Sequence, residues 1–142
     1  MKTSARNEFL GRVKVVNKGA VTAEVILDIG GGYDLVANIT LESVDNLALT
    51  IGKEAYALVK APWVIITTED NQLKTSARNK LCGVVSYCQE GAVNGEVIIT
   101  LDAGQSVAAI ITDESIKSLG LKQGVRVCAL IKASHIILAV NA

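Results

Sequence analysis

Hydrophobic and polar residues alternate along short stretches of this chain, and turn signals separate the stretches. Residues 9–16 are rich in apolar side chains, and residues 21–29 (VTAEVILDI) and 35–39 (LVANI) lie on either side of the segment GGGYD. Alternation over about four to eight residues predicts half-buried β-strands. Residues 54–60 (EAYALVK) and 63–67 (WVIIT) complete a set of five predicted strands.

One segment departs from this alternation. Apolar residues in 41–49 (LESVDNLAL) recur at roughly helical spacing, which predicts a short helix that ends near Gly52. Pro62, the single proline, lies between the last two predicted strands, where it can end a strand or occupy a sheet edge. Five strands with a helix between the third and the fourth predict an all-β fold, an OB-like five-stranded Greek-key barrel.

The same pattern occurs twice. The hexapeptide KTSARN stands at residues 2–7 and again at 74–79, and a shift of 72 positions superimposes GAVTAEVIL on GAVNGEVII and YALVKAPWVII on CALIKASHIIL without a gap. This duplication predicts two tandem domains, residues 1–68 and 75–142, joined by a short polar linker at 69–74. Domains this small bury too little surface to be stable alone, so we expect them to dock and the chain to form an oligomer.

Composition narrows the classes of partner. Fourteen basic and fourteen acidic residues give no net charge, and one tryptophan, three tyrosines and one phenylalanine are few for base stacking. We therefore expect no nucleic-acid and no membrane partner. The chain starts with polar and charged residues, and no apolar run approaches the ~20 residues that cross a bilayer, which favours a cytoplasmic protein.

All three cysteines lie in the second half, without CxxC spacing. An odd number without that spacing predicts neither a disulfide framework nor a zinc site. The first half has apolar residues at the same positions of the repeat, so we interpret the cysteines as small hydrophobic residues. Cys82, Cys88 and Cys128 lie over Leu10, Val16 and Tyr56.

Eight polar positions recur in both halves once apolar, glycine and turn positions are set aside. Most carry hydrogen-bond donors, and each half offers one arginine and one lysine but no cluster of metal-ligating side chains. Fixed cations with neutral donors suit a small dianion, because arginine forks onto oxygen pairs and lysine supplies a point charge. The set comprises Ser4, Arg6, Asn7, Glu24, Thr40, Glu42, Ser43 and Lys60, with Ser76, Arg78, Asn79, Glu96, Thr112, Glu114, Ser115 and Lys132.

Each of these positions also has a structural interpretation. Thr40 stands where the short helix begins, beside N–H groups that can bind an oxyanion together with Ser43, but the same threonine can act only as an N-cap. Arg6 and Lys60 can be ordinary surface cations. Glu24 either faces solvent or forms a structural ion pair, and the same alternatives apply in the second half.

Other features give no support for catalysis. The glycines at 30–32 lack the GK[ST] ending of a phosphate-binding loop, so a hairpin turn is the better interpretation. His135 aligns with Trp63, and a catalytic or metal-binding histidine would leave the first half without its equivalent. No nucleophile, base and orienting acid recur together, so we expect no enzyme activity, no direct metal ligand and no organic cofactor.

Four motifs resemble those of the molbindin domain, also called the Mop or TOBE domain, which binds molybdate. They are TSARN, GAVxxEV, ITxxS, and VKAPWV or IKASHI. The resemblance covers nearly the whole chain, twice, and two such domains are similar to the cytoplasmic tandem molbindins. It implies a homotrimer with a hexameric ring of OB-like domains that binds molybdate, with tungstate as a substitute.

The resemblance also implies oxyanion sites at interfaces between domains. The TSARN and KA segments of one domain supply one part of each site, and the ITxxS segment of a neighbouring domain supplies the other. Ser134 stands where the first half has Pro62, so the two classes of site differ by one hydroxyl. The implied residues are Ser4, Ala5, Arg6, Lys60 and Ala61, then Ser76, Ala77, Arg78, Lys132, Ala133 and Ser134, with Thr40, Ser43, Thr112 and Ser115 as complements.

Further oxyanion sites near a three-fold axis are implied at two turns. One turn comprises Lys18, Gly19 and Ala20, and the other comprises Glu90, Gly91 and Ala92. Because Glu90 replaces the cation Lys18, the second turn departs from an anion-binding pattern.

The leading functional hypothesis is intracellular binding, storage and homeostasis of molybdate and tungstate. The alternative is a non-catalytic molybdate-sensing module that acts through a separate protein partner, because the two copies leave no room for a DNA-binding or ATPase region. Oligonucleotide binding is suggested by the OB-like strand order alone, and it conflicts with the zero net charge and the few aromatic residues.

Overall fold

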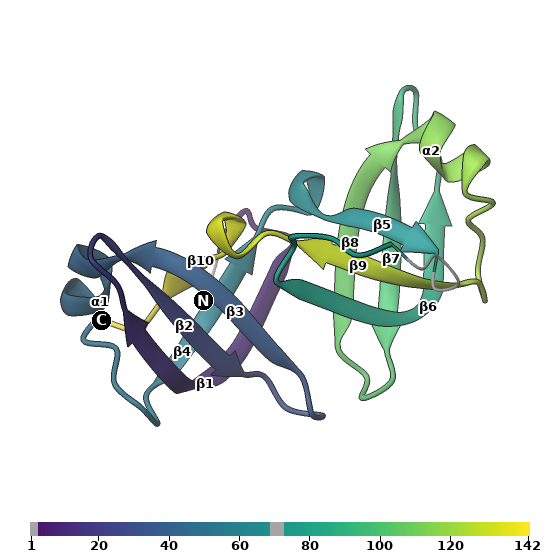
Figure 1. Ribbon diagram of the computed structural model, residues 1–142. Helices are drawn as coiled ribbons and strands as arrows, with labels where there is room; N and C mark the ends of the chain where they lie inside the picture. The colour runs from purple at the N-terminus through teal and green to yellow at the C-terminus, as the bar shows by residue number, and fades with distance from the viewer. Residues whose placement is uncertain (1–2, 69–72) are drawn as a thin grey trace.

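The computed structural model describes residues 3–68 and 73–142, and it contains two five-stranded antiparallel sheets (Figure 1). The first half provides β1 (Asn7–Lys18), β2 (Thr22–Asp28), β3 (Asp34–Thr40), α1 (Leu41–Asn46), β4 (Glu54–Val59), the 3-10 turn η1 (Ala61–Trp63) and β5 (Ile65–Thr68). The second half provides β6 (Asn79–Gln89), β7 (Asn94–Leu101), β8 (Ser106–Thr112), α2 (Asp113–Ser118), β9 (Arg126–Ile131), the 3-10 turn η2 (Ala133–His135) and β10 (Ile137–Ala139).

Each sheet has the strand order of an OB-like barrel. The order is β10-β4-β1-β2-β3 in the first sheet and β5-β9-β6-β7-β8 in the second. The predicted all-β class, the five strands of each barrel and the helix between its third and fourth strands are confirmed. Four strands of each barrel come from one half of the chain, and the fifth comes from the other half.

The expectation that each half completes its own barrel is therefore wrong for the fifth strand. β5 pairs with β9, with Ile66 opposite Ala129, and β10 pairs with β4, with Leu138 opposite Ala57. Figure 1 shows β10, in yellow, beside β4, and β5 beside β9. The sequence cannot distinguish these pairings, because WVIIT and HIILA have the same apolar pattern and each suits either barrel. The exchange joins the two halves through both sheets.

Of the predicted linker, residues 69–72 lie outside the described part of the chain.

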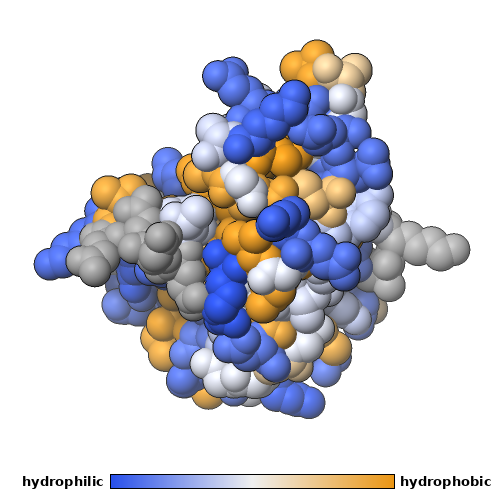
Figure 2. Space-filling model, turned by 90° about the vertical axis from the view of Figure 1, so that its right-hand side faces the viewer, coloured by the Kyte–Doolittle hydropathy of each residue, from blue (hydrophilic) through white to orange (hydrophobic). Residues whose placement is uncertain are grey.

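The hydrophobic core follows from the alternation seen in the sequence. In β1 the side chains of Phe9 and Val13 are buried, whereas Glu8 and Arg12, each one position before a buried residue, are exposed. Buried side chains of both barrels form one hydrophobic cluster, which includes residues of the exchanged strands β5 and β10. On the face of the second barrel shown in Figure 2, hydrophobic surface is also exposed among hydrophilic side chains.

The glycine-rich segment is a hairpin turn between β2 and β3, as predicted, and it also contacts the other half of the chain. Gly31 has a φ of +65°, and a Cβ built there would lie 2.2 Å from the Cβ of Ala103 in the β7–β8 hairpin. Gln105 Nε2 donates a hydrogen bond of 3.0 Å to the carbonyl oxygen of Gly30. Glycine is needed because the left-handed backbone and the close approach both exclude a side chain.

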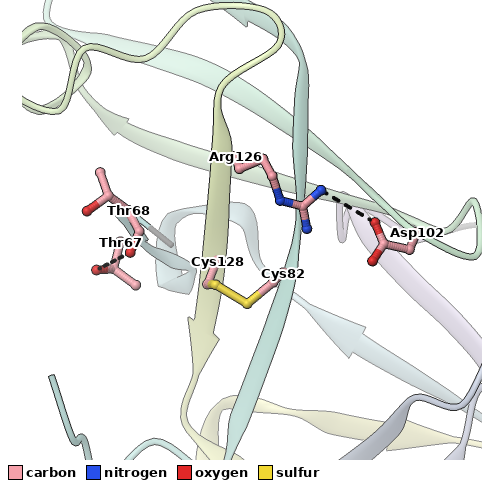
Figure 3. Close-up of a disulfide and its surroundings, with 6 residues drawn as sticks. All are labelled: Thr67, Thr68, Cys82, Asp102, Arg126 and Cys128. Atoms are coloured by element: carbon pink, nitrogen blue, oxygen red, sulfur yellow. Dashed lines mark hydrogen bonds and ion pairs between the residues drawn. A yellow bond between two sulfur atoms is a disulfide. The ribbon is translucent and has the colours of Figure 1, made fainter. Parts of the chain in front are cut away.

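The interpretation of Cys82 and Cys128 as unpaired hydrophobic residues is wrong. The two residues lie directly opposite each other in β6 and β9 and form a disulfide (Figure 3). The odd cysteine count concealed this pair, because the register of β6 against β9 follows from the fold and not from a separation of 46 residues along the chain. Cys88 is the remaining free thiol.

The disulfide can be checked by counting thiols. We expect alkylation of the unfolded, unreduced chain to modify Cys88 alone, and alkylation after reduction to modify all three cysteines. In the folded chain, burial and then the charge of Glu90 raise the pKa of Cys88. Its alkylation at neutral pH is therefore slow, because the thiolate is the reactive form. Mass spectrometry counts the labels, and three labels without reduction would contradict the disulfide.

Candidate functional site

The recurring arginines and lysines lie at the same end of each barrel. Asn7 of β1 is opposite Val59 of β4, so Arg6 and Lys60 are the next residues on two antiparallel strands. In the second barrel Asn79 is opposite Ile131, which places Arg78 and Lys132 in the same relation. The strand register thus brings one arginine and one lysine together in each half, as a cation pair.

Each arginine of these pairs contacts a glutamate of the other half. Arg6 forms a two-pronged ion pair with Glu96 of β7, in which Nη1 lies 3.3 Å from Oε2. Arg78 forms the same contact with Glu24 of β2, with Nη2 3.3 Å from Oε1. Hydrogen bonding to the carboxylate, followed by its charge, raises the pKa of both guanidinium groups. The interpretation of Glu24 and Glu96 as partners in structural ion pairs is confirmed.

The threonines at the two helix starts are N-caps. Thr40 Oγ1 accepts a hydrogen bond of 3.1 Å from the N–H of Ser43 and donates one of 2.8 Å to Ser43 Oγ. Thr112 and Ser115 repeat both contacts at the same distances. Because Thr40 donates its own hydrogen, the Ser43 hydroxyl keeps a hydrogen for another acceptor.

Some backbone donors near the helix start already have partners. The N–H of Leu41 donates to the carbonyl of Val21 at 3.4 Å, and the N–H of Ser43 is used by the N-cap. The helix α1 has only six residues. An acceptor approaching this point therefore meets the Ser43 hydroxyl, and two of the N–H groups expected from the sequence are already used.

The structure brings hydroxyls of both halves into one small cavity of about 270 Å³. The 3-10 turn η2 packs against β3, and this contact places Ser134 in the same cavity as Thr40 and Ser43. The turn η1 packs against β8, which ends at Thr112, in the equivalent arrangement. Pro62 occupies the position of Ser134 there, so that side offers no hydroxyl from the turn.

The two turns also meet each other. The rings of Trp63 and His135, which are equivalent in the repeat, lie 4.8 Å apart between centroids. Lys60 Nζ lies 5.3 Å from the centroid of the Trp63 ring, at cation–π distance. The lysine of the first cation pair is thus placed next to the contact between the two turns.

The remaining candidate residues are arranged less favourably for a ligand. The N–H groups of Ala5 and Ala77 donate to Thr3 and Thr75 at 3.1 and 3.3 Å, so they are occupied. Ser4 and Ser76 are exposed, Ala61 is buried and Ala133 is half-buried. In the two turns implied near a three-fold axis, Gly19 and Gly91 donate to the Thr22 carbonyl and the Asp113 carboxylate, and Lys18 lies 3.9 Å from Asp45.

Sequence reasoning gave no role to the asparagines of the two KTSARN motifs. Asn7 and Asn79 are buried, and each hydrogen-bonds to a strand of the other half. Their recurrence in both copies of the motif was the signal that could have revealed them. In the described residues 3–68 and 73–142, no three His, Cys, Asp or Glu side chains are grouped to hold a metal ion, and no helix is long and apolar enough to span a membrane.

Comparison with known proteins gives matches over the whole chain. The model of the TOBE domain matches residues 3–66 and 75–138. The molybdenum transport protein ModE of Azotobacter vinelandii is 48% identical over 140 residues, which cover 99% of this chain and 52% of that protein. The molybdenum-pterin-binding protein MopA of Rhodobacter capsulatus is 42% identical over 139 residues, 98% of this chain and 52% of that protein. The chain therefore spans about half the length of these two relatives.

A solved structure matches both barrels at once. The cytoplasmic molybdate-binding protein ModG, crystallised with molybdate bound, is 48% identical, with a TM-score of 0.96 over 99% of this chain and 100% of that one. The agreement extends over both halves of the chain. With a TOBE match in each half and a full-length structural counterpart, the chain belongs to the TOBE-domain family and is a molbindin with two such domains in tandem.

Proposed function

We propose that this protein binds molybdate, and tungstate in its place, as an intact oxyanion and stores it in the cytoplasm without chemical change. The observation that carries the proposal is the similarity over the whole chain to a protein crystallised with molybdate bound. The donor set agrees with it, because each half has an arginine and a lysine beside each other, and Thr40, Ser43 and Ser134 line one cavity. Two fixed cations balance the charge of a dianion.

Two classes of site follow from the contacts between the halves. The first class combines Arg6 and Lys60 with Thr112 and Ser115, and the second combines Arg78 and Lys132 with Thr40 and Ser43. Support comes from the packing of η1, which follows Lys60, against β8, and of η2, which follows Lys132, against β3, because β8 ends at Thr112 and β3 ends at Thr40. The proposed ligands further include Ser4 and Ala61 in the first class, and Ser76, Ala133 and Ser134 in the second. The N–H groups of Ala5 and Ala77 join them when the anion replaces Thr3 and Thr75 as their acceptors.

Selectivity follows from a site built of donors. Hydrogenphosphate carries a proton that needs an acceptor, and a buried pair of donors facing each other costs about 1 to 3 kcal/mol. Sulfate has the charge of molybdate but is smaller, so it cannot reach all the donors of a rigid site together. We therefore propose discrimination by hydrogen-bond geometry and size and not by net charge.

The assembly that we propose is a homotrimer with a ring of six domains. Large apolar side chains are exposed at equivalent positions of the repeat, namely Val21 and Val93, and Ile65 and Ile137. Their recurrence supports burial in a symmetric assembly, since an isolated chain gains nothing from exposing the same apolar positions twice. Light scattering after size-exclusion chromatography measures the state: three times the chain mass of 14.9 kDa agrees with the proposal, and a monomer contradicts it.

A calorimetric titration with molybdate in excess sulfate and phosphate tests the function. We expect micromolar or tighter binding of more than one molybdate per chain, because each half carries its own donor set. The same titration with sulfate alone should give no comparable heat. Absence of binding, checked by equilibrium dialysis, would mean that the recurring donors have only a structural role.

The hydroxyl of Ser134 should distinguish the two classes of site. We expect Ser134→Ala to weaken molybdate binding about three- to tenfold at the class of site that contains Thr40, because one neutral hydrogen bond is lost. The exposed Ser106 outside the cavity provides a control, and Ser106→Ala should change nothing. Equal affinities for Ser134→Ala and the unaltered chain would remove Ser134 from the site.

The glutamates that contact the arginines should oppose anion binding. In the double variant E24Q/E96Q each guanidinium loses a carboxylate partner, so we expect molybdate affinity to rise about three- to tenfold at low salt. Calorimetry measures the change, and Glu54→Gln, at an exposed carboxylate that pairs with Arg12, is the control. Weaker binding by the double variant would mean that the carboxylates orient the arginines for the ligand.

A further inference from the structure

Asn7 and Asn79 are the buried polar residues among the residues that the structure describes, each 2% exposed. Both lie in a KTSARN motif whose other members, where the structure describes them, are exposed or half-buried. A buried amide is stable only when its donors and acceptor find partners. The partners of these two side chains therefore indicate why the chain keeps an asparagine at this position twice.

The side chain of Asn79 joins three strands. Its Oδ1 accepts a hydrogen bond of 2.7 Å from the N–H of Val36 in β3, and its Nδ2 donates one of 2.8 Å to the carbonyl of the same residue. Nδ2 also donates to the carbonyl of Ile131 in β9, at 3.2 Å. One amide on β6 thus holds β3 of the first half against β9 of the second.

Asn7 makes the two contacts between the halves in the opposite direction, from β1 of the first half to β8 of the second. Its Oδ1 accepts from the N–H of Ala108 in β8 at 2.7 Å, and its Nδ2 donates to the Ala108 carbonyl at 2.9 Å. Ala108 follows Val36 by 72 positions, as Asn79 follows Asn7. The two halves are therefore clamped by the same contact used reciprocally.

The three strands that meet at Asn79 are the ones that carry the proposed ligands of one site. Arg78 immediately precedes Asn79, Lys132 immediately follows Ile131, and Thr40 stands four residues after Val36 on β3. In the other class of site, Asn7 immediately follows Arg6, and its hydrogen-bond partner Ala108 stands four residues before Thr112. Each asparagine lies where the cation part of a site is fixed relative to its hydroxyl part.

Asparagine has the chemistry that this position needs. A single planar amide presents a donor and an acceptor side by side, which matches the N–H and the carbonyl of one residue on an edge strand. A serine hydroxyl is shorter, an aspartate lacks the donors when ionised, and a glutamine places the same amide one methylene further out. The paired hydrogen bonds to the edge strand therefore require asparagine and not merely a polar residue.

We propose that Asn79 and Asn7 are positioning residues for the oxyanion sites: without contacting the anion, each sets the separation between the Arg–Lys pair of one half and the Thr–Ser pair of the other. The inference rests on the proposed function. Asn79 serves the class of site with Arg78 and Thr40, and Asn7 serves the class with Arg6 and Thr112. Loss of one asparagine therefore weakens its own class of site.

The test uses variants in which one class of site remains. In a chain with Arg6→Ala, molybdate binding reports on the class with Arg78. Adding Asn79→Ala should raise the Kd there about tenfold or more, the effect of losing a clamp of several hydrogen bonds. In a chain with Arg78→Ala, adding Asn7→Ala should do the same for the other class. Asn17→Ala, at an exposed asparagine of β1, is the control and should leave the Kd within twofold.

A second variant separates positioning from stability. Asn79→Gln keeps the amide but moves it, so we expect a higher Tm than for Asn79→Ala together with a Kd that stays at least about fivefold above that of the parent. An unchanged Kd in Asn79→Ala despite a lower Tm, equal weakening of both classes by one replacement, or full recovery of the Kd in Asn79→Gln would each overturn the inference. If the unaltered chain binds no molybdate, the proposed function itself fails, and the inference fails with it.

Discussion

Replacement of Arg6 and Arg78 together by alanine is expected to weaken molybdate binding about 100-fold at each class of site. Each arginine supplies a full charge and a fork of N–H donors, and charge-assisted hydrogen bonds contribute about 1.5 to 3 kcal/mol each. Lys60 and Lys132 remain, but a single ammonium group cannot form the two parallel hydrogen bonds to a pair of oxygens that a guanidinium forms. Calorimetry with molybdate measures the loss.

The fold should survive this double replacement. Both arginines are about half exposed, and exposed ion pairs such as Arg6–Glu96 contribute only about 0 to 1 kcal/mol each. Arg12→Ala is the matched control, since Arg12 is an exposed arginine whose Nη1 donates to the Gly52 carbonyl at 3.1 Å, away from both cation pairs. Unchanged molybdate affinity in the double variant, with the control also unchanged, would refute the assignment of the arginines.

Truncation of Leu138 is expected to destabilise the protein by about 2 to 4 kcal/mol. Leu138 belongs to the second half in sequence, but it is 7% exposed in the core of the first barrel, opposite Ala57 of β4. Leu138→Ala therefore leaves a cavity in the barrel formed by the other half. Chemical denaturation measures the free energy of unfolding.

An exposed leucine of the first barrel provides the control. Leu10 of β1 is 49% exposed, so Leu10→Ala should change the free energy of unfolding by no more than about 0.5 kcal/mol. Hydrogen exchange locates the effect of Leu138→Ala: faster exchange in β4 and β1 is expected from the strand exchange. A loss confined to β9 and β6 would show that β10 stays with its own half.

The order of strands and helices could be predicted because it depends on local pattern. Alternation gave the strands, and Thr40 with the following apolar residues gave the helix start. The exchange of β5 and β10 could not be predicted, because the two segments share one apolar pattern and suit either barrel. The disulfide between Cys82 and Cys128 depends on the register of β6 against β9, which is a property of the folded sheet.

The candidate site was predictable to the level of residue type. Recurrence identified Arg6 with Lys60, and Arg78 with Lys132, and the strand register brings each pair together. Recurrence shows which residues are repeated but not which half of the chain each side chain contacts. The contact of each arginine with a glutamate of the other half is therefore seen only in the folded structure. For the same reason the asparagines were recognised as repeated but not as clamps between halves.

Anomalous diffraction from crystals grown with molybdate tests the central claim most directly, because it locates the molybdenum atoms without assumptions about ligands. We expect a peak within hydrogen-bonding reach of the guanidinium of Arg6 and the ammonium of Lys60, beside Thr112 and Ser115, and an equivalent peak in the second class of site. Molybdenum peaks only at other positions would contradict the account. So would bound molybdate that none of Arg6, Lys60, Arg78 and Lys132 contacts.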